Sequence, residues 1–587
     1  MNSWELRERA RHTLAKEVGF VTKPHGDRLR VALAFPNTYW VGMSNLGFQT
    51  VYRLLNAEDD IVCERFFLPP KQELAGMVAA RTPLLTLESQ TAVGEFDVVA
   101  FSVSFEWDYV NVLTLLRLAG VPRYAAERNA RHPLVVVGGA VTFVNPEPLA
   151  PFADVIAAGE GEALVPGLRR ALAVATDRSE LLRLLAAERG FYVPSLYEPE
   201  YAPDGTLAGY RRAGDAPADI ALPVRKAALR TTEAVDPPAT SIFTPDTEFG
   251  SRFLVEVVRG CANLCRFCWA GYNYLPVRAF PTDRILELAR AARAHASRVG
   301  LVSIALCDHP DIERILARLL EMGYAISPAS LRLDDLTEPI VRVLRDSGER
   351  SITIAPETGS DRLRRVINKT VTNDEILERA ELIFASGIEN LKLYYMIGLP
   401  TETDEDLVAI RDLTLQMRER MLKHARGRGQ IGRIVGSVNP LVPKPGTAYQ
   451  WMPMEDPSSV ERKIKRLRSL TADIDNVYFN IKSERHSYYQ ALLSLGDRRV
   501  APAIEIAERN GQNWRAAVAE AGVDGDFYIF RDRSRDGFLP WDIIDGGMKR
   551  AFFEAELAKS FREEWTLPPK RAHENLKLLP VIDAAVD

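Results

Sequence analysis

The chain has 587 residues, which allows about three or four domains, and 47% of them are hydrophobic, so several cores can be buried. A net charge of −5 gives no sign of a protein that binds nucleic acid over its whole surface, and no apolar run is long enough to span a bilayer. The five cysteines argue against a disulfide framework, and we expect a cytoplasmic protein without a membrane segment.

The first part of the chain predicts a doubly wound α/β domain. Short apolar runs at residues 30–35, 97–101, 134–137 and 153–157 alternate with helical stretches. Strands that alternate with helices form a parallel sheet that is covered on both faces. Ligands bind such sheets at the loops that follow the carboxyl ends of the strands. We assign residues 1–225 to this domain, together with a leading helix and a linker.

These loops resemble those of the cobalamin-binding, flavodoxin-like domain that precedes one subgroup of radical S-adenosylmethionine enzymes. The first loop of that family reads D-x-H-x-x-G, and a serine-containing loop and a glycine pair follow later in the chain. The resemblance implies these candidate cobalamin contacts: Asn37, Tyr39, Gly42, Ser44, Ser102, Gly138 and Gly139.

Tyr39 stands where the family has its cobalt-binding histidine. A tyrosine hydroxyl, with a pKa near 10, is a poor substitute for an imidazole on cobalt. Many radical members of the subgroup also lack the histidine. Two interpretations therefore stay open: a cobalamin site without this ligand, or a domain of the same fold that binds no corrin.

Three cysteines, Cys261, Cys265 and Cys268, stand in a C-x3-C-x2-C loop directly after the apolar run 253–258 and an Arg259-Gly260 turn. This spacing suits a cubic iron–sulfur cluster, in which three cysteines hold three irons and the fourth iron stays open. A structural zinc site needs four ligands, usually from two separated pairs, and the chain has no second C-x2-C. Cys307 or His309 could complete such a zinc site.

The cysteine spacing, the aromatic Phe267 and the position after a strand resemble the radical S-adenosylmethionine (SAM) superfamily. The resemblance implies a [4Fe–4S] cluster whose open iron chelates SAM. Reductive cleavage of SAM then gives a 5′-deoxyadenosyl radical that abstracts hydrogen from a substrate. An electron donor such as flavodoxin or ferredoxin is implied as a partner.

From residue 253 to about 451 strands and helices alternate again. Candidate strands at 301–306, 325–332, 351–355, 390–396 and 433–438 join the strand before the cysteines to make six β/α units. This resembles the open, partial (β/α)6 TIM-like barrel of the radical SAM superfamily, which we assign to residues 226–454. Chemistry is expected at the carboxyl ends of the strands.

Several segments at these strand ends resemble the SAM-binding segments of the superfamily. Glu357 is the candidate for the ribose, and Ser330 and Arg332 for the methionyl carboxylate or the ribose. The backbone at Ile397 and Gly398, and Val442, are expected near the adenine, with Phe267 beside the cluster. An alternative for Glu357 and Arg332 is a mutual salt bridge at the barrel rim.

Residues 455–587 predict a small, mostly helical α+β capping region. It contains a basic run on a helix, which is a solvated face or an RNA contact: Arg462, Lys463, Lys465, Arg466 and Arg468. Four strings, at 36–49, 266–278, 355–369 and 439–451, resemble one poorly characterised radical SAM family with a cobalamin-binding-like first domain.

The sequence thus predicts a radical SAM enzyme that functionalises an unactivated C–H bond, by cobalamin-dependent methylation if corrin binds. A methylthiotransferase-like modification of RNA or protein is an alternative, disfavoured because it generally needs a second cluster. A non-catalytic iron–sulfur or zinc scaffold that binds RNA or a partner is another. The substrate stays open among small molecules, peptides and RNA.

Overall fold

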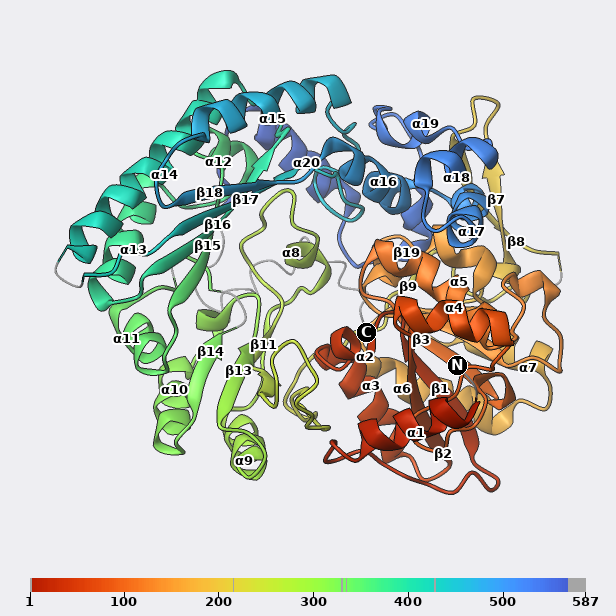
Figure 1. The fold of residues 1–587 in the computed structure, drawn as a ribbon. Helices are drawn as coiled ribbons and strands as arrows, with labels where there is room; N and C mark the ends of the chain where they lie inside the picture. The colour runs from red at the N-terminus through yellow and green to blue at the C-terminus, as the bar shows by residue number, and fades with distance from the viewer. Residues whose placement is uncertain (1–2, 215, 329–330, 334, 427–428, 568–587) are drawn as a thin grey trace.

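A six-stranded sheet forms the centre of the N-terminal domain (Figure 1). The computed structural model describes residues 3–214, 216–328, 331–333, 335–426 and 429–567. The sheet has the order β2-β1-β3-β4-β5-β6, with five parallel strands and an antiparallel β6. The strands are β1 (Leu29–Phe35), β2 (Ile61–Phe67), β3 (Val98–Ser102), β4 (Leu134–Gly138), β5 (Val155–Ala157) and β6 (Phe191–Tyr192). The order 2-1-3-4-5 is that of flavodoxin-like folds, so the predicted fold class is confirmed.

Helices cover both faces of this sheet (Figure 1). They are α1 (Ser3–Leu14), α2 (Tyr39–Gly42), α3 (Leu46–Ala57), α4 (Lys71–Ala80), α5 (Tyr109–Leu118), α6 (Gly161–Val174) and α7 (Arg178–Ala187). Because the sheet is covered on both faces, β1, β3 and β4 are nearly continuous apolar runs. Helices α3 and α6 pack against each other on one face.

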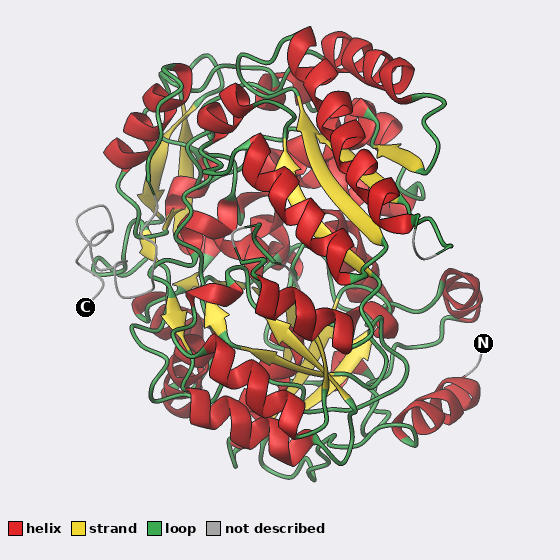
Figure 2. Ribbon diagram, turned by 90° about the vertical axis from the view of Figure 1, so that its left-hand side faces the viewer, coloured by secondary structure: helices red, strands yellow, loops and turns green. Residues whose placement is uncertain are grey.

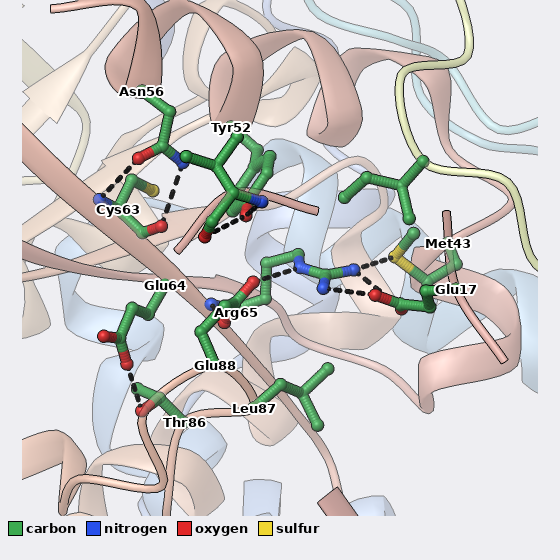
Figure 3. Close-up of polar contacts among 12 residues, drawn as sticks. Glu17, Met43, Tyr52, Asn56, Cys63, Glu64, Arg65, Thr86, Leu87 and Glu88 are labelled. Carbon is green, nitrogen blue, oxygen red and sulfur yellow. Dashed lines mark hydrogen bonds and ion pairs between the residues drawn. The ribbon is translucent and has the colours of Figure 1, made fainter. Parts of the chain in front are cut away.

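Strand β2 was not predicted, because two charged residues, Glu64 and Arg65, interrupt its apolar run. Figure 3 shows the Arg65 guanidinium between two carboxylates. Its Nε donates to Glu88 at 2.7 Å, and its terminal nitrogens donate to Glu17 at 2.6 and 2.9 Å. All three side chains are almost completely buried. Arg65 therefore ties two distant segments of the chain to the edge strand of the sheet.

Replacing Arg65 with alanine will leave Glu17 and Glu88 as unpaired buried charges. We expect the free energy of unfolding to fall by about 3–5 kcal/mol, measured by urea denaturation. The matched control is Arg30→Ala, which removes an exposed ion pair with Asp97. That pair is worth at most about 1 kcal/mol. Equal effects of the two substitutions would contradict this account of the cluster.

The second unit is a partial barrel of parallel strands. Its strands fall into two hydrogen-bonded blocks, β10-β13-β14 and β15-β16-β17-β18. They are β10 (Phe253–Glu256), β13 (Arg298–Val302), β14 (Ala325–Pro328), β15 (Ser351–Glu357), β16 (Asn390–Ile397), β17 (Ile434–Pro440) and β18 (Val477–Ile481). Strand β18 extends the predicted six-stranded barrel and lies beyond the expected domain boundary at residue 454.

The barrel helices form an outer layer over these strands in both views (Figures 1 and 2). They are α9 (Thr282–Ala292), α10 (Ile312–Glu321), α11 (Glu338–Asp346), α12 (Asp361–Ile367), α13 (Asn373–Ser386), α14 (Asp404–Ala425) and α15 (Pro457–Thr471). Side chains of β16 and β17 alternate between buried positions toward the helices and less buried positions on the inner face. Because the barrel strands run parallel to one another, their carboxyl ends lie at one rim.

The C-terminal part is mostly helical and bridges the other two units. It contains α16 (Glu484–Leu495), α17 (Ala501–Arg509), α18 (Trp514–Glu520), α19 (Gly525–Ile529), β19 (Ile544–Asp545) and α20 (Arg550–Phe561). Arg123 of the N-terminal domain pairs with Glu505 and Glu508 of α17. Lys444 from the barrel binds both Glu106 and Ser494. These contacts fix the N-terminal domain relative to the barrel rim.

Short strands complete the connections between these units. They are β7 (Tyr197–Tyr201), β8 (Leu207–Arg212), β9 (Val224–Arg225), β11 (Val258–Arg259) and β12 (Arg278–Ala279). Strand β9 of the linker pairs with β19 of the C-terminal part. Among the helices that the structure describes, none is both long enough and apolar enough to cross a membrane.

Candidate active site between the sheet and the barrel

The three cysteines lie in a loop at the carboxyl end of β10. The short antiparallel pair β11–β12 closes this loop, and α8 (Trp269–Asn273) begins directly after Cys268. Gly260 adopts φ +95°, and a Cβ there would lie 2.4 Å from the Tyr274 carbonyl oxygen. Only glycine fits this turn, which leads the chain from β11 into the cysteines.

Cys261 and Cys265 are buried and Cys268 is half-buried. Burial raises the pKa of all three thiols, that of Cys261 to about 11. Among the described residues, no three Cys, His, Asp or Glu side chains converge on a position for one metal ion. His309 cannot complete a zinc site in this arrangement, because its ring nitrogens contact the Phe280 carbonyl and the Asp311 amide. A set of three thiols suits a cluster with several irons better than one zinc ion.

Phe267 packs into a small apolar cluster that joins the cysteine loop to the barrel rim. This cluster includes Leu363 of α12, Leu399 after β16 and Leu441 after β17. The Leu441 amide donates to the Ile397 carbonyl at 2.8 Å. The structure thus brings Phe267 close to the strand ends that contain Ile397, Gly398 and Val442.

Glu357 ends β15 with φ +64° and forms an ion pair of 3.3 Å with Lys369. Burial raises the pKa of Glu357. Arg332 pairs with Asp308 at 3.0 Å and with Asp335 at 3.1 Å. At the rim, Glu357 thus pairs with a lysine and Arg332 with two aspartates, in place of the mutual salt bridge considered from the sequence. Ser330 lies outside the described residues.

Gly398 adopts φ +76°, and its amide donates to Glu402 at 2.7 Å. Lys463 of the predicted basic run pairs with Glu402 and Glu455. It therefore supports the Gly398 turn and does not belong to a solvated basic face. The other four basic residues of the run are exposed on α15. Burial raises the pKa of Glu402 to about 7.

Buried polar atoms at this rim that have no hydrogen-bond partner among the described residues include Oγ1 of Thr358, which follows Glu357, and Oδ1 of Asn439 on β17. Buried polar atoms are usually paired, so such atoms indicate a place for a polar ligand. They lie beside the segments that were predicted to contact SAM.

A cavity of about 470 Å³ lies between the N-terminal sheet and the barrel. One end is an apolar slot between the sheet and helices α3 and α6, lined by Val31, Val98, Leu55 and Leu168 among others. The opposite end reaches Arg259 and Gly260, directly before Cys261, and residues 302–304 after β13. The volume is typical of a site for a small molecule or cofactor.

Two family profiles match the chain. The profile of the radical SAM proteins, N-terminal, matches residues 47–194, and that of the radical SAM superfamily matches residues 255–414. Together they cover more than half of the chain and include the whole cysteine loop. The chain belongs to the radical SAM superfamily. It is therefore an enzyme, and the interpretation as a non-catalytic scaffold is not supported.

The chain is also similar to known proteins. This radical SAM enzyme is 26% identical over 480 residues to an uncharacterized protein of Methanocaldococcus jannaschii. The alignment covers 81% of this chain and 91% of that protein. It is 24% identical over 274 residues to the tRNA-2-methylthio-N(6)-dimethylallyladenosine synthase of Thermotoga petrophila, covering 44% and 55% of the two chains. The chain thus spans about half the length of that synthase.

The fold is similar to that of a solved radical SAM methyltransferase, TsrM from Kitasatospora setae, which has cobalamin and a [4Fe–4S] cluster bound. The TM-score is 0.50 at 13% identity, and the alignment covers 84% of this chain and 99% of that chain. At this identity the comparison shows a shared fold.

Superfamily membership implies a [4Fe–4S] cluster and SAM as the cofactors of this radical SAM enzyme. The thiols of Cys261, Cys265 and Cys268 are the residues that would hold the cluster. The partnerless atoms of Thr358 and Asn439 fit a polar ligand such as SAM at the rim. Lys369, which pairs with Glu357, was not predicted, since its role depends on a contact twelve residues away.

Only some of the predicted cobalamin contacts line the cavity. Ser102, Gly138 and Gly139 line it. Asn37, Tyr39, Gly42 and Ser44 are not among its lining residues. The Tyr39 hydroxyl donates to Glu17 at 2.6 Å, Gly42 packs against Phe67, and the Ser44 hydroxyl donates to the Trp40 carbonyl at 2.7 Å.

Asn37 donates to Asp108, a buried carboxylate that also accepts from Asn111. Burial raises the pKa of Asp108 to about 6 from an ordinary value of 3.8. Between these values the folded state holds a proton that the unfolded state has released, so this group lowers stability as pH rises.

Asp108→Asn removes this titration and keeps an oxygen acceptor for both amides. We expect the variant to gain about 2–3 kcal/mol relative to the wild type between pH 4 and pH 7. The measurement is urea unfolding of both proteins across that range. A difference between the two proteins that does not change with pH would refute this prediction.

Five further residues of the cavity were not predicted as site residues: Asn45, Ser104, Glu160, Glu162 and Arg259. Arg259 pairs with Glu160 at 3.1 Å, with Glu162 at 2.9 Å and with Glu256 at 2.8 Å. It thus joins the N-terminal domain to the start of the cysteine loop. The sequence signals were present, since Glu160 and Glu162 follow the last predicted strand and Arg259 precedes the cysteines.

Proposed function

We propose that this radical SAM enzyme is a cobalamin-dependent methyltransferase that acts on an unactivated carbon atom. The observation that carries the proposal is the cavity of about 470 Å³. It starts in an apolar slot of the flavodoxin-like domain and ends at the two residues that precede the cluster cysteines. A cofactor in this cavity would lie between the domain that holds it and the site of radical formation.

The two ends of the cavity fit different parts of cobalamin. The slot is lined by aliphatic side chains such as Leu33, Val136 and Leu164, which suit an aromatic base. At the carboxyl edge of the sheet, Asn45, Ser102 and Ser104 offer hydrogen bonds to polar amide groups. A Cβ at Gly138 would have no atom closer than 3.7 Å, so this glycine leaves room for a flat ring.

Among the described residues that line the cavity, there is no histidine. The proposed site therefore supplies no imidazole to the lower face of cobalt, which agrees with the tyrosine at position 39. When bound, cobalamin would carry the methyl group, while the protein positions the reactants and excludes water.

At the barrel rim we assign SAM to the side chains and backbone at the strand ends. The cluster cysteines would hold the iron, Glu357 would accept the ribose hydroxyls, and Arg332 would contact the methionyl carboxylate. The backbone of Ile397 and Gly398, and Val442, would lie along the adenine. Phe267, packed beside Leu399 and Leu441, would lie beside the cluster.

Methylthiolation is the second candidate, because the relative from Thermotoga petrophila is named for that reaction. A second cluster held by three cysteines would need ligands that this chain lacks, since only Cys63 and Cys307 remain. Cys63 is buried on β2, far along the sequence from Cys307. The cysteine count therefore favours methylation.

The substrate class is open among small molecules, peptides and RNA. A flavodoxin or ferredoxin would supply electrons to the cluster, and a reducing cytoplasm would suit both the cluster and the five free thiols.

The test is an anaerobic assay with reconstituted protein, SAM and a low-potential reductant, with and without hydroxocobalamin. We expect 5′-deoxyadenosine in both samples, and S-adenosylhomocysteine only when cobalamin is present, since cobalamin accepts the methyl group. S-adenosylhomocysteine that forms equally well without cobalamin would contradict the proposal and favour methylthiolation.

A further inference from the structure

The segment that covers the outer side of the cysteine loop comes from the far end of the chain. Helix α20 (Arg550–Phe561) and residues 562–566 contact both the loop and α12. We call α20 with residues 562–566 the C-terminal clamp. None of the motifs that identify the superfamily lies in it.

Arg266, between Cys265 and Phe267, is the centre of these contacts. Its side chain and that of Glu556 are fully buried, and its Nε donates to Glu556 at 3.1 Å. Its other nitrogens donate to the carbonyl groups of Arg365 at 2.7 Å, Val366 at 3.0 Å and Glu564 at 2.8 Å. The single guanidinium therefore joins the cysteine loop, α12 and the C-terminal clamp.

The contacts with α12 satisfy the end of that helix. The last carbonyl groups of a helix have no partner within it. Arg266 supplies donors to three of them, two from its side chain and one from its backbone amide, which donates to Ile367 at 2.9 Å. The fixed fork of an arginine suits such a set of acceptors better than lysine does.

Asn368 makes the reverse connection. It ends α12 with φ +54°, and its Nδ2 donates to the carbonyl groups of Asn263 at 3.3 Å and Leu264 at 3.1 Å. Its amide group also exchanges hydrogen bonds with the backbone of Thr566. The loop backbone is thus held at residues 263 and 264 by the Asn368 side chain and at Arg266 by the Ile367 carbonyl of α12.

Glu556 keeps the C-terminal clamp in place. Its second carboxylate oxygen accepts from Lys559 at 2.9 Å and from the Thr566 hydroxyl at 2.6 Å. Ser560 donates to the Val366 carbonyl at 2.8 Å, and Phe553 packs on Tyr272 of α8. The two contacts of Glu556 lie within the clamp, whereas those of Ser560 and Phe553 connect the clamp to α12 and α8, which border the cysteine loop.

We propose that the C-terminal clamp is a positioning element for the iron–sulfur cluster, acting through Arg266 and Asn368 on the backbone between the cysteines. It holds Cys265 and Cys268 in place before the cluster is built and keeps the loop closed afterwards. The inference depends on the cluster that superfamily membership implies, and not on cobalamin. Failure of cobalamin to bind would therefore leave it unaffected.

The test compares Glu556→Gln with Glu554→Gln, an exposed position on the same helix. Both variants and the wild type are reconstituted anaerobically, and iron and sulfide per chain are measured. The bleaching of the cluster absorbance is then followed in air. We expect Glu556→Gln to take up less iron and to bleach several-fold faster, with Glu554→Gln like the wild type.

Two further variants separate positioning from folding. Thr566→Val removes one hydroxyl contact to Glu556 at a half-buried site, and Arg266→Lys keeps the charge but not the fork. We expect both to bleach faster than the wild type. The apo form of Thr566→Val, which loses only a half-buried hydroxyl, should unfold at the wild-type temperature, whereas Arg266→Lys leaves buried acceptors without a donor and should also unfold at a lower temperature. Wild-type iron content and bleaching rate in Glu556→Gln and in both of these variants would overturn the proposal.

Discussion

Replacing any one of Cys261, Cys265 or Cys268 with alanine will abolish cleavage of SAM. Each thiol is expected to hold one iron of the cluster, and the loop contains no other cysteine to replace it. A chain with two ligands cannot keep a stable cubic cluster, so no electron reaches the sulfonium group. We expect 5′-deoxyadenosine to fall below detection in a chromatographic assay, together with a large loss of bound iron.

The matched control for this experiment is Cys307→Ser. Cys307 lies after β13, close to the barrel rim, but outside the three-cysteine loop. We expect this variant to keep its iron and its 5′-deoxyadenosine production. Loss of both in Cys307→Ser would show that Cys307 is a ligand, and normal activity in Cys265→Ala would refute the cluster assignment.

We expect Gly138→Leu to weaken the proposed binding of cobalamin and to leave the cluster intact. Gly138 is the last residue of β4 and lines the cavity. Its surroundings accept a methyl group, since the nearest atom to an added Cβ lies at 3.7 Å, whereas a longer side chain extends into the proposed site. If overpacking costs about 1–3 kcal/mol of binding free energy, the affinity for cobalamin falls about 5- to 150-fold. Equilibrium dialysis measures this loss.

Two variants serve as controls for Gly138→Leu. Gly138→Ala should bind almost as well as the wild type. Gly209→Leu adds the same side chain on β8, where an added Cβ meets no atom within 4 Å. It should change neither cobalamin affinity nor iron content. Unchanged cobalamin affinity in Gly138→Leu would place the cofactor elsewhere, and loss of iron would indicate a general folding defect.

Most strands of the N-terminal sheet were predictable because they are buried on both faces. Runs such as that of β4, Leu134–Gly138, contain almost no polar residue, so the sequence alone predicts that they are buried. Strand β2 was missed because Glu64 and Arg65 interrupt its pattern. Their partners, among them Glu17 and Glu88, lie far away in sequence, and no local rule reveals them.

The cysteine loop was predictable for a different reason, since its chemistry depends on residue spacing within eight positions. The candidate cobalamin contacts could be predicted from the sequence only in part. Ser102, Gly138 and Gly139 stand at strand ends and line the cavity, as the topology requires. In the loop after β1, however, the Tyr39 hydroxyl donates to Glu17, and Tyr39 does not line the cavity. The direction of a loop side chain depends on tertiary contacts, which alignment with a motif cannot supply.

Charged residues were the least predictable part of the site. Lys463 looked like one member of a basic helix face, yet it pairs with Glu402 below the Gly398 turn. Arg259 and Arg266 likewise each pair with a glutamate about one hundred or more residues away, Glu160 and Glu556. Such pairs stabilise a site only after the three parts of the chain have come together.

The most direct test of the whole account is an electron paramagnetic resonance spectrum of the anaerobic protein loaded with cob(II)alamin and freed of excess cofactor. We predict one bound cobalt per chain without nitrogen hyperfine splitting, because no histidine lines the described part of the cavity and the base of the cofactor would enter the apolar slot. A cobalt signal with nitrogen splitting, or a chain that keeps its iron–sulfur cluster and no cobalt, would contradict it.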